Sequence, residues 1–319
     1  MVRRRRREKI ETDMFAALKF PEFSPFVFSI GGFPLRWYAV SYILGLVLSF
    51  SYANQLVKRP HLYGLPKSPV SKEDMDDIFT WSLIGIILGG RLGYLLFYTL
   101  TTASGRANIA SDPMSLLRIW DGGLSFHGGF IGVCVVIFLV SRIRKVPLLA
   151  FADMGAMIAP ISIFMVRILG NFMNAELYGR HTESPVGMVF PEGIAPNYSG
   201  PPAAWDAVEK IWVYAGTEMP RHPSQIYEGL LEGLLPTIVL AILAFRFGLL
   251  KKPGLAAGLF FILYGIGRSI SEFFREPDAH IGFLPGGATM GMLLSTPMWL
   301  AGAFLIWYAL KEKPLSAPN

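Results

Sequence analysis

Residues 150–170, AFADMGAMIAPISIFMVRILG, form an almost uninterrupted apolar run in the middle of the chain. A helix that crosses the hydrocarbon core of a membrane needs about 20 residues of this kind. The run nevertheless carries Asp153 near its start and Arg167 near its end. A charged side chain inside a span costs about 2.5–3.5 kcal/mol on insertion scales, so it normally has a partner or a task. The run therefore predicts a membrane helix that also carries functional polar residues.

The composition of the whole chain supports a membrane protein. Of its 319 residues, 52% are hydrophobic and only 16% are charged, and the mean hydropathy is +0.44. Soluble domains carry about 25% charged residues, so the composition excludes a soluble enzyme, a disordered protein and a fibrous repeat. The net charge of +6 is a weaker signal, because residues 1–13 supply half of it. We interpret that arginine-rich run as a solvated tail and expect no nucleic acid as a partner.

Six further apolar runs have the length of membrane spans. They lie near 37–57, 78–100, 124–141, 226–247, 254–274 and 289–310. The sequence therefore predicts an all-α integral membrane protein with about seven transmembrane helices. The loops on one side carry twelve Lys and Arg residues in short segments, and those on the other carry six in longer ones. The positive-inside rule then places the C-terminus in the cytoplasm and the N-terminus outside. The arginine-rich tail contradicts this orientation unless translation starts at Met14.

The longest segment between spans, residues 171–225, is expected to lie on the outer side of the membrane. It is rich in Gly and Pro but contains Trp205, Trp212 and Tyr214. A passive linker needs no aromatic residues, so we predict an ordered cap over a site in the membrane. The predicted organisation is residues 1–36 as a tail and outer-face arm, 37–170 as helices 1–4, 171–225 as the head, 226–310 as helices 5–7 and 311–319 as a cytoplasmic tail.

Polar residues occur in four segments that otherwise resemble spans. They are Arg91 in LGGRLGYLLFY, His127 in WDGGLSFHGGFIG, then Arg167, Asn171, Asn174 and Glu176, and finally Arg268, Glu272 and Arg275. Arg268 and Glu272 are four residues apart on one helical face and can simply neutralise each other. Arg91 can bond to a kinked backbone or snorkel to an interface. Arginine exceeds glutamate in this set, which favours an anionic ligand within the membrane, and phospholipid phosphate is the obvious candidate.

Several kinds of site are not indicated. There is no HEXXH sequence and no His, Cys, Asp or Glu spacing typical of a metal site. There is no GxGxxG sequence and no P-loop, and the segment GLSFHGG lacks the GxSxG pattern of a nucleophile elbow. We therefore expect neither a metal nor a cofactor.

The segments together resemble the prolipoprotein diacylglyceryl transferase family of bacterial inner membranes. The similarity runs through FPEFSPFVFSIGGFPLRWYAVSYILG, LGGRLGYLLFY, WDGGLSFHGGFIGV, GNFMNAELYGR, RHPSQIYEGLLEG and GRSISEFFREPD. It implies seven spans, an outer N-terminus and a periplasmic head. It also implies a reaction of lipoprotein biosynthesis, in which the sn-1,2-diacylglyceryl group of phosphatidylglycerol passes to the lipobox cysteine of a prolipoprotein signal peptide. A thioether forms and glycerol phosphate leaves.

The resemblance also implies roles for individual residues. His127 is a plausible base, because a thiol of pKa about 8.5 must lose its proton before it attacks carbon. A positioned arginine is the alternative, as a stabiliser of the thiolate. Arg167 and Arg268 would stabilise the negative charge of the leaving group. The remaining positions implied in catalysis or in shaping the lipid site are Tyr38, Asn171, Glu176, Gly179, Tyr264, Glu272 and Arg275.

One departure from the family pattern concerns Arg167. In the pattern GRxGNFxNxE the arginine stands three residues before the first asparagine, whereas Arg167 stands four before Asn171. A π-bulge can absorb the added residue; otherwise the arginine turns by about 100° around the helix. A transporter or flippase of an anionic lipid is the alternative function, although we find no internal repeat of the kind such proteins commonly show. A membrane scaffold would leave the buried charges without a purpose.

Overall fold

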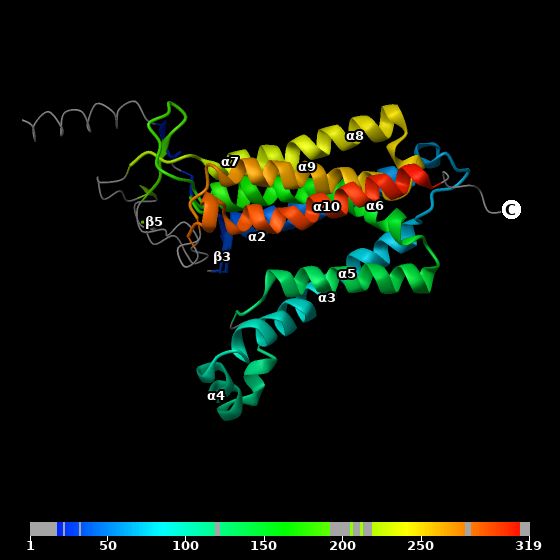
Figure 1. Cartoon of the computed structure of the whole chain (residues 1–319). Coiled ribbons are helices and arrows are strands. Elements are labelled where there is room, and N and C mark those ends of the chain that lie inside the picture. The colour runs from blue at the N-terminus through cyan, green and yellow to red at the C-terminus, as the bar shows by residue number, and fades with distance from the viewer. Residues whose placement is uncertain are drawn as a thin grey trace, which may run out of the picture.

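The computed structural model describes residues 18–21, 23–31, 33–118, 122–191, 205–206, 211–212, 219–277 and 282–312. In this part of the chain, long helices form a bundle, and short strands lie at the end opposite the C-terminus (Figure 1). The predicted all-α membrane architecture is confirmed. Six helical stretches are long and apolar enough to cross a membrane: Trp37–Val57, His127–Arg144, Leu148–Phe172, Ser224–Phe247, Leu255–Glu272 and Met290–Lys311.

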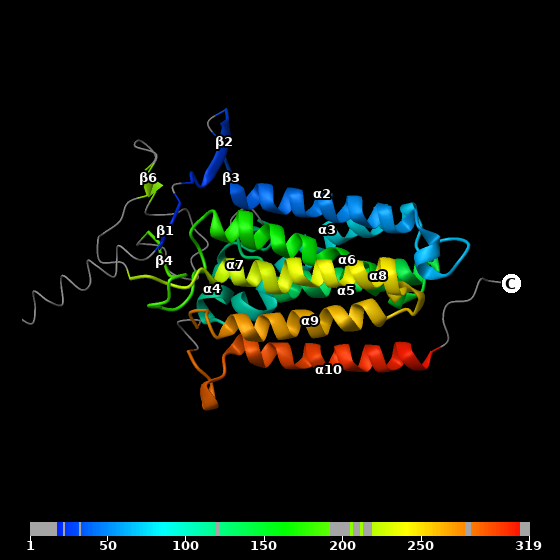
Figure 2. The same cartoon turned by 90° about the horizontal axis from the view of Figure 1, so that it is seen from above.

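The main bundle is built on helix α6 (Leu148–Met165), which contacts α2 (Trp37–Val57), α8 (Leu235–Phe247) and α9 (Leu255–Glu272). Helix α10 (Met290–Lys311) packs on α9 at the edge of the bundle (Figure 2). Three of the described segments are π-helices: η5 (Val166–Phe172) continues α6, η6 (Gly229–Leu234) joins α7 (Ser224–Glu228) to α8, and the third is η2 (Leu95–Thr99). The other short helices are η1 (Pro60–Tyr63), α4 (Ala103–Ser111), η3 (Pro113–Leu116), η7 (Leu249–Lys251) and η8 (Pro285–Gly287).

Helices α3 (Lys72–Tyr94) and α5 (Phe126–Arg144) form a pair set apart from the main bundle (Figure 1). Small residues let their backbones approach closely. A Cβ atom on Gly128 would lie 2.2 Å from the carbonyl oxygen of Gly89, and one on Gly132 would lie 2.0 Å from that of Gly85. We call this contact of Gly85, Gly89, Gly93, Gly128 and Gly132 the glycine seam. The expected span 78–100 overlaps α3 and η2, and α3 begins with the charged turn KEDMDD. This helix is not among the six that are long and apolar enough to cross a membrane, so the count of seven spans stays a prediction.

The short strands belong to the end of the bundle opposite the C-terminus. Strand β1 (Leu18–Lys19) pairs in parallel with β4 (Met188–Val189), and β2 (Phe26–Ile30) pairs in antiparallel with β3 (Phe33–Arg36). A small apolar core of Phe20, Phe172, Ala175, Tyr178, Met188 and Phe190 joins β1 and β4 to the end of η5. This packing fixes the segment that follows the expected fourth span.

Part of the predicted head segment is described. Strands β5 (Trp205–Asp206) and β6 (Ile211–Trp212) form an antiparallel pair in which Trp205 lies opposite Trp212. Tyr214 and the tail at residues 1–17 lie outside the described residues. The domain boundaries and the cap over the site therefore stay predictions.

Asp153, the first charge of the opening apolar run, has a structural partner. Its carboxylate accepts hydrogen bonds from the backbone amides of Gly254, at 2.7 Å, and Ala257, at 2.8 Å. These amides belong to the first turn of α9, where backbone N–H groups have no partner within the helix. Asp153 therefore caps α9 from the neighbouring helix α6.

Candidate functional site

Arg167, the second charge of the opening run, lies in the π-helix η5. The backbone amide of Met173 donates to the carbonyl of Ile168, five residues earlier, at 3.2 Å. A π-helical turn accommodates one more residue than an α-helical turn, and such turns are frequent at functional sites. The residue added between Arg167 and Asn171 is therefore absorbed by η5, which is the first of the two expected outcomes.

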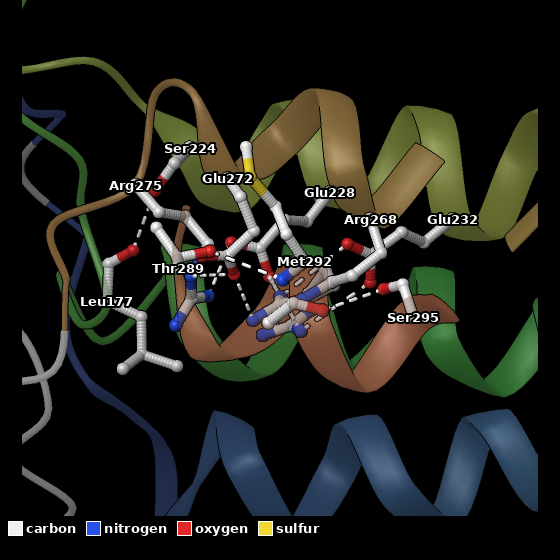
Figure 3. Close-up of polar contacts among 12 residues, drawn as sticks. Leu177, Ser224, Glu228, Glu232, Arg268, Glu272, Arg275, Thr289, Met292 and Ser295 are labelled. Atoms are coloured by element: carbon white, nitrogen blue, oxygen red, sulfur yellow. Dashed lines mark hydrogen bonds and ion pairs between the residues drawn. The ribbon is translucent and has the colours of Figure 1, made fainter. Parts of the chain in front are cut away.

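The π-helix brings Arg167 into a cluster of three arginines and three glutamates. We call Arg167, Glu228, Glu232, Arg268, Glu272 and Arg275 the six-charge cluster. Its members come from η5, α7, η6, α9 and the segment after α9, and most of them are seen in Figure 3. Elements far apart in the sequence thus place their charged side chains together within the bundle.

Glu228 is the centre of this cluster. One of its carboxylate oxygens lies 2.6 Å from Nη2 of Arg167 and 3.4 Å from Nη1 of Arg268. The other lies 2.6 Å from Nη1 of Arg275. A buried carboxylate is tolerated when it is paired and hydrogen-bonded, and Glu228 contacts all three arginines.

The other two glutamates are held differently. Glu272 pairs with Nη2 of Arg268 and lies 3.3 Å from Nε of Arg275. Glu232 lies 3.6 Å from Nη2 of Arg167 and 3.6 Å from Nη1 of Arg268. Among the described residues, neither carboxylate oxygen of Glu232 has a hydrogen-bond partner. Arg268 and Glu272 thus form the expected pair, but within a larger network.

The exposure of these side chains is asymmetric. Glu228 and Glu232 are 0% exposed, whereas the side chains of Arg167 and Arg268 are each 18% exposed. Within the cluster, these two arginine side chains are therefore partly accessible, whereas the two glutamates are fully buried. The segments singled out in the sequence hold more arginine than glutamate, whereas the cluster holds three of each once Glu228 and Glu232 are included. An anionic ligand stays a prediction.

Tyr38 and Asn171 extend the cluster toward α2. The Nδ2 group of Asn171 donates to the hydroxyl oxygen of Tyr38 at 2.6 Å. Nη1 of Arg167 donates to the Oδ1 atom of Asn171 at 3.3 Å. Tyr264 on α9 interacts electrostatically with Glu232 and with both Arg167 and Arg268. The structure therefore brings these three predicted residues to the cluster.

Glu176 and Gly179 lie in the segment after η5, beside the cluster. The amide of Gly179 donates to the carbonyl of His222 at 2.8 Å. A Cβ atom on Gly179 would lie 2.1 Å from the carbonyl oxygen of Phe274, so only glycine fits between these two segments. Burial raises the pKa of the Glu176 carboxyl to about 8, although the positive charge of Arg36 opposes the shift. Gly179 thus allows the close contact that holds the chain just before Arg275.

His127 and Arg91 belong to another part of the molecule. His127 is an exposed residue in the first turn of α5, whose main packing partner is α3. Arg91 on α3 donates to the carbonyls of Leu116, at 3.0 Å, and Gly122, at 2.8 Å. Of the two roles expected for Arg91, the structure shows hydrogen bonding to the backbone. Through these bonds Arg91 holds the loop that precedes α5. The structure does not place His127 among the six charges.

Glu228 and Glu232 were not among the residues predicted from the sequence. Both lie inside the expected span 226–247 and are four residues apart, so the criterion applied to Arg268 and Glu272 would have found them. Glutamates at the start of a span can also face water at the interface, which made their pairing with distant arginines hard to predict. Only the fold shows that their carboxylates point at the arginines.

Comparisons with known proteins identify the family. A family model described as prolipoprotein diacylglyceryl transferase matches residues 25–308. Three relatives carry the name phosphatidylglycerol–prolipoprotein diacylglyceryl transferase. The protein of Bradyrhizobium diazoefficiens is 41% identical over 95% of this chain and 98% of its own length. Those of Nitrobacter hamburgensis and Rhodopseudomonas palustris are 43% and 44% identical, over 94% and 92% of this chain and 93% and 92% of their own lengths. The chain belongs to the prolipoprotein diacylglyceryl transferase family.

Proposed function

We propose that the six-charge cluster binds the phosphate of phosphatidylglycerol while the diacylglyceryl group passes to a prolipoprotein. The chain is a multi-pass membrane transferase of lipoprotein biosynthesis, as its family and its apolar helices indicate. The names of its relatives state both substrates, phosphatidylglycerol and a prolipoprotein. The acceptor atom in this proposal is the thiol of the lipobox cysteine, and the membrane is the bacterial inner membrane.

The exposure of the arginines is the observation that carries the proposal. The side chains of Arg167 and Arg268 are partly accessible, while Glu228 and Glu232 are fully buried. A phosphate that reaches the cluster can therefore contact these arginines, and the buried carboxylates are not exposed to repel it. Guanidinium groups match phosphate oxygens with two parallel hydrogen bonds, and such bonds are strong where water is excluded. The cluster is therefore suited to hold a lipid phosphate within the bundle.

The chemistry follows from this placement. The thiolate attacks the glyceryl carbon that carries the phosphate ester, a carbon–sulfur bond forms, and the carbon–oxygen bond breaks. The electron pair of that bond goes to the phosphate oxygen, so negative charge grows on the leaving glycerol phosphate. Arginines already fixed in place stabilise charge that develops in the transition state. Glu228 holds Arg167, Arg268 and Arg275 in their positions, so they need little reorganisation.

Tyr38, Asn171 and Tyr264 have supporting roles in this proposal. Asn171 bonds to Tyr38 on one side and to Arg167 on the other, which fixes the guanidinium toward α2. Glu176 and Gly179 shape the adjoining segment, and Gly179 keeps Phe274 and therefore Arg275 close. His127 lies on α5, outside the cluster. Its proposed role as the base that deprotonates the thiol is therefore a separate hypothesis. The transporter alternative gains no support from the relatives reported above, which are all named as transferases.

The test uses purified full-length protein in detergent with phosphatidylglycerol and a peptide that carries a lipobox cysteine. We expect a thioether-linked diacylglyceryl peptide and an equal amount of glycerol phosphate, both measured by mass spectrometry. A matched peptide with Cys→Ser should give no product. Lipid transport between vesicle leaflets, measured with the same protein, is expected to be absent. Lack of thioether product, or transport without transfer, would overturn the proposal.

A further inference from the structure

Arg180 lies where three segments that adjoin the six-charge cluster meet. The segment that follows η5 pairs with the segment before α7, with His181 opposite Arg221. It also pairs with the segment after α9, with Gly179 opposite Arg275. Because η5, α7 and α9 each supply members of the cluster, this junction sets how their charged side chains lie relative to one another.

Arg180 forms hydrogen bonds with both neighbouring segments. Its backbone carbonyl accepts from the amide of His222 at 2.9 Å, and its backbone amide donates to the carbonyl of Phe274 at 2.8 Å. In its guanidinium group, Nε donates to the carbonyl of Arg275 at 2.7 Å and Nη2 to that of Glu272 at 3.0 Å. The last carbonyls of a helix have no partner within it, and arginine side chains can bond to them. Arg180 therefore caps the end of α9 from a distant part of the chain.

Arg275 is the member of the cluster that these bonds restrain most directly. Its carbonyl accepts from Arg180, while its own guanidinium donates to Glu228 at 2.6 Å and lies 3.3 Å from Glu272. Arg275 and Arg268 both line a cavity beside the cluster. A phosphate in this cavity can therefore contact Arg275, and the position of that guanidinium depends on the backbone that Arg180 holds.

We propose that Arg180 is a positioning residue that fixes Arg275 for contact with the lipid phosphate. This inference rests on the proposed function, in which the cluster binds that phosphate. Among the described residues Arg180 forms no ion pair, and its side chain donates to backbone carbonyls, so it acts through Arg275. A group that is already fixed in its binding position loses less conformational freedom when the ligand binds. Loss of Arg180 therefore weakens the binding of phosphatidylglycerol and leaves that of the prolipoprotein unchanged.

The first experiment measures KM for phosphatidylglycerol and KM for a lipobox peptide, because neither value depends on how much of the protein is folded. A hydrogen bond to a charged group is worth about tenfold or more in affinity, so Arg180→Ala should raise KM for the lipid about tenfold and leave KM for the peptide unchanged. Arg91→Ala is the matched control, since Arg91 also donates to backbone carbonyls, and both of its KM values should stay those of the wild type. A lower apparent kcat in Arg180→Ala with both KM values unchanged would overturn the inference.

The second experiment combines Arg180→Ala with Arg275→Ala. If Arg180 acts through Arg275, the double variant should have the same KM for phosphatidylglycerol as Arg275→Ala alone, because coupled residues are not additive. A further rise by the full factor seen in Arg180→Ala would overturn the inference. Arg180→Lys is the milder variant; it keeps the charge but not the planar fork, so its KM for the lipid should also rise. A wild-type KM in Arg180→Lys would assign the effect to charge and contradict positioning, whereas a wild-type protein that forms no thioether would overturn the proposed function instead.

Discussion

The six-charge cluster and the glycine seam are two buried contacts built by opposite means. In the cluster, side chains from five segments meet through ion pairs around Glu228. In the seam, α3 and α5 approach because Gly89 and Gly128 have no side chains. The first contact gathers charged side chains, which we propose bind a phosphate, and the second brings two helix backbones close together.

The two regions teach that an unusual residue in a span does not identify a site by itself. Arg91 and Arg268 both looked functional in the sequence, since each places a guanidinium in an apolar helix. The guanidinium group of Arg91 donates hydrogen bonds to backbone carbonyls of the loop before α5. Arg268 instead contacts three carboxylates and stays 18% exposed. The partners of an arginine therefore separate a structural role from a binding role.

The largest expected effect distinguishes these two arginines. Arg268→Ala removes a guanidinium from the proposed phosphate site, so we expect kcat/KM for thioether formation to fall by about 10²–10³-fold. Arg91→Ala removes hydrogen bonds to carbonyls, so the folded fraction should keep most of the transfer rate and unfold at a lower temperature. Both are measured with phosphatidylglycerol and a lipobox peptide, normalised to folded protein. Equal losses of transfer in the two variants would show that the regions share one role.

His127→Asn tests the α3–α5 region in the same comparison. His127 lies on α5 and not in the six-charge cluster, but as the proposed base it should cost about 10²-fold in kcat when it is replaced, the usual loss on removal of an acid–base catalyst. The assay is the same, with the pH profile recorded from about 6 to 9 because the thiol ionises near the top of this range. The loss should shrink at high pH, where the thiol ionises without a base. A much smaller loss, or one that is the same at every pH, would remove the base role from His127.

Much of the fold follows from the sequence because apolar length is a local property. The run at 150–170 and five of the six further runs coincide with helices long and apolar enough to cross a membrane. Arg167, Arg268 and Arg275 could also be predicted as unusual residues, because a charge in an apolar run is recognised without knowing its partners in space. The added residue before Asn171 also predicted, as one of two outcomes, the π-helix that the structure contains.

The partners of these residues were not predictable, because they come from distant segments. Asp153 caps α9 through Gly254 and Ala257, about a hundred residues later in the chain. Glu228 meets Arg167 only because α7 lies against η5. The sequence therefore indicated that charges were buried but not how they were balanced. That is why Glu228 and Glu232, which balance the arginines in the cluster, were not among the predicted residues.

Gly128→Ala tests the seam directly. Its Cβ atom would lie 2.2 Å from the carbonyl oxygen of Gly89, so α3 and α5 must move apart. Such overpacking typically costs about 1–3 kcal/mol, and we expect a lower unfolding temperature in detergent with the transfer rate of folded protein largely kept. Gly129→Ala is the matched control, because its Cβ would meet its nearest neighbour, the carbonyl oxygen of Ile86, at an ordinary 3.5 Å. Equal stability of the two variants would contradict close backbone packing as the basis of the seam.

The smallest expected effect concerns Glu176, beside the cluster. Burial raises the pKa of its carboxyl from 4.5 to about 8 in the folded protein. Between these values the folded state binds more protons than the unfolded state, so this carboxyl's contribution to stability is full below about pH 4.5 and is lost as the pH rises toward 8. Glu176→Gln removes the titration and should flatten that part of the dependence of unfolding temperature on pH. The measurement is thermal unfolding in detergent from about pH 5 to pH 8. A wild-type curve that rises with pH, or an unchanged slope in the variant, would show that Glu176 stays ionised when the protein folds.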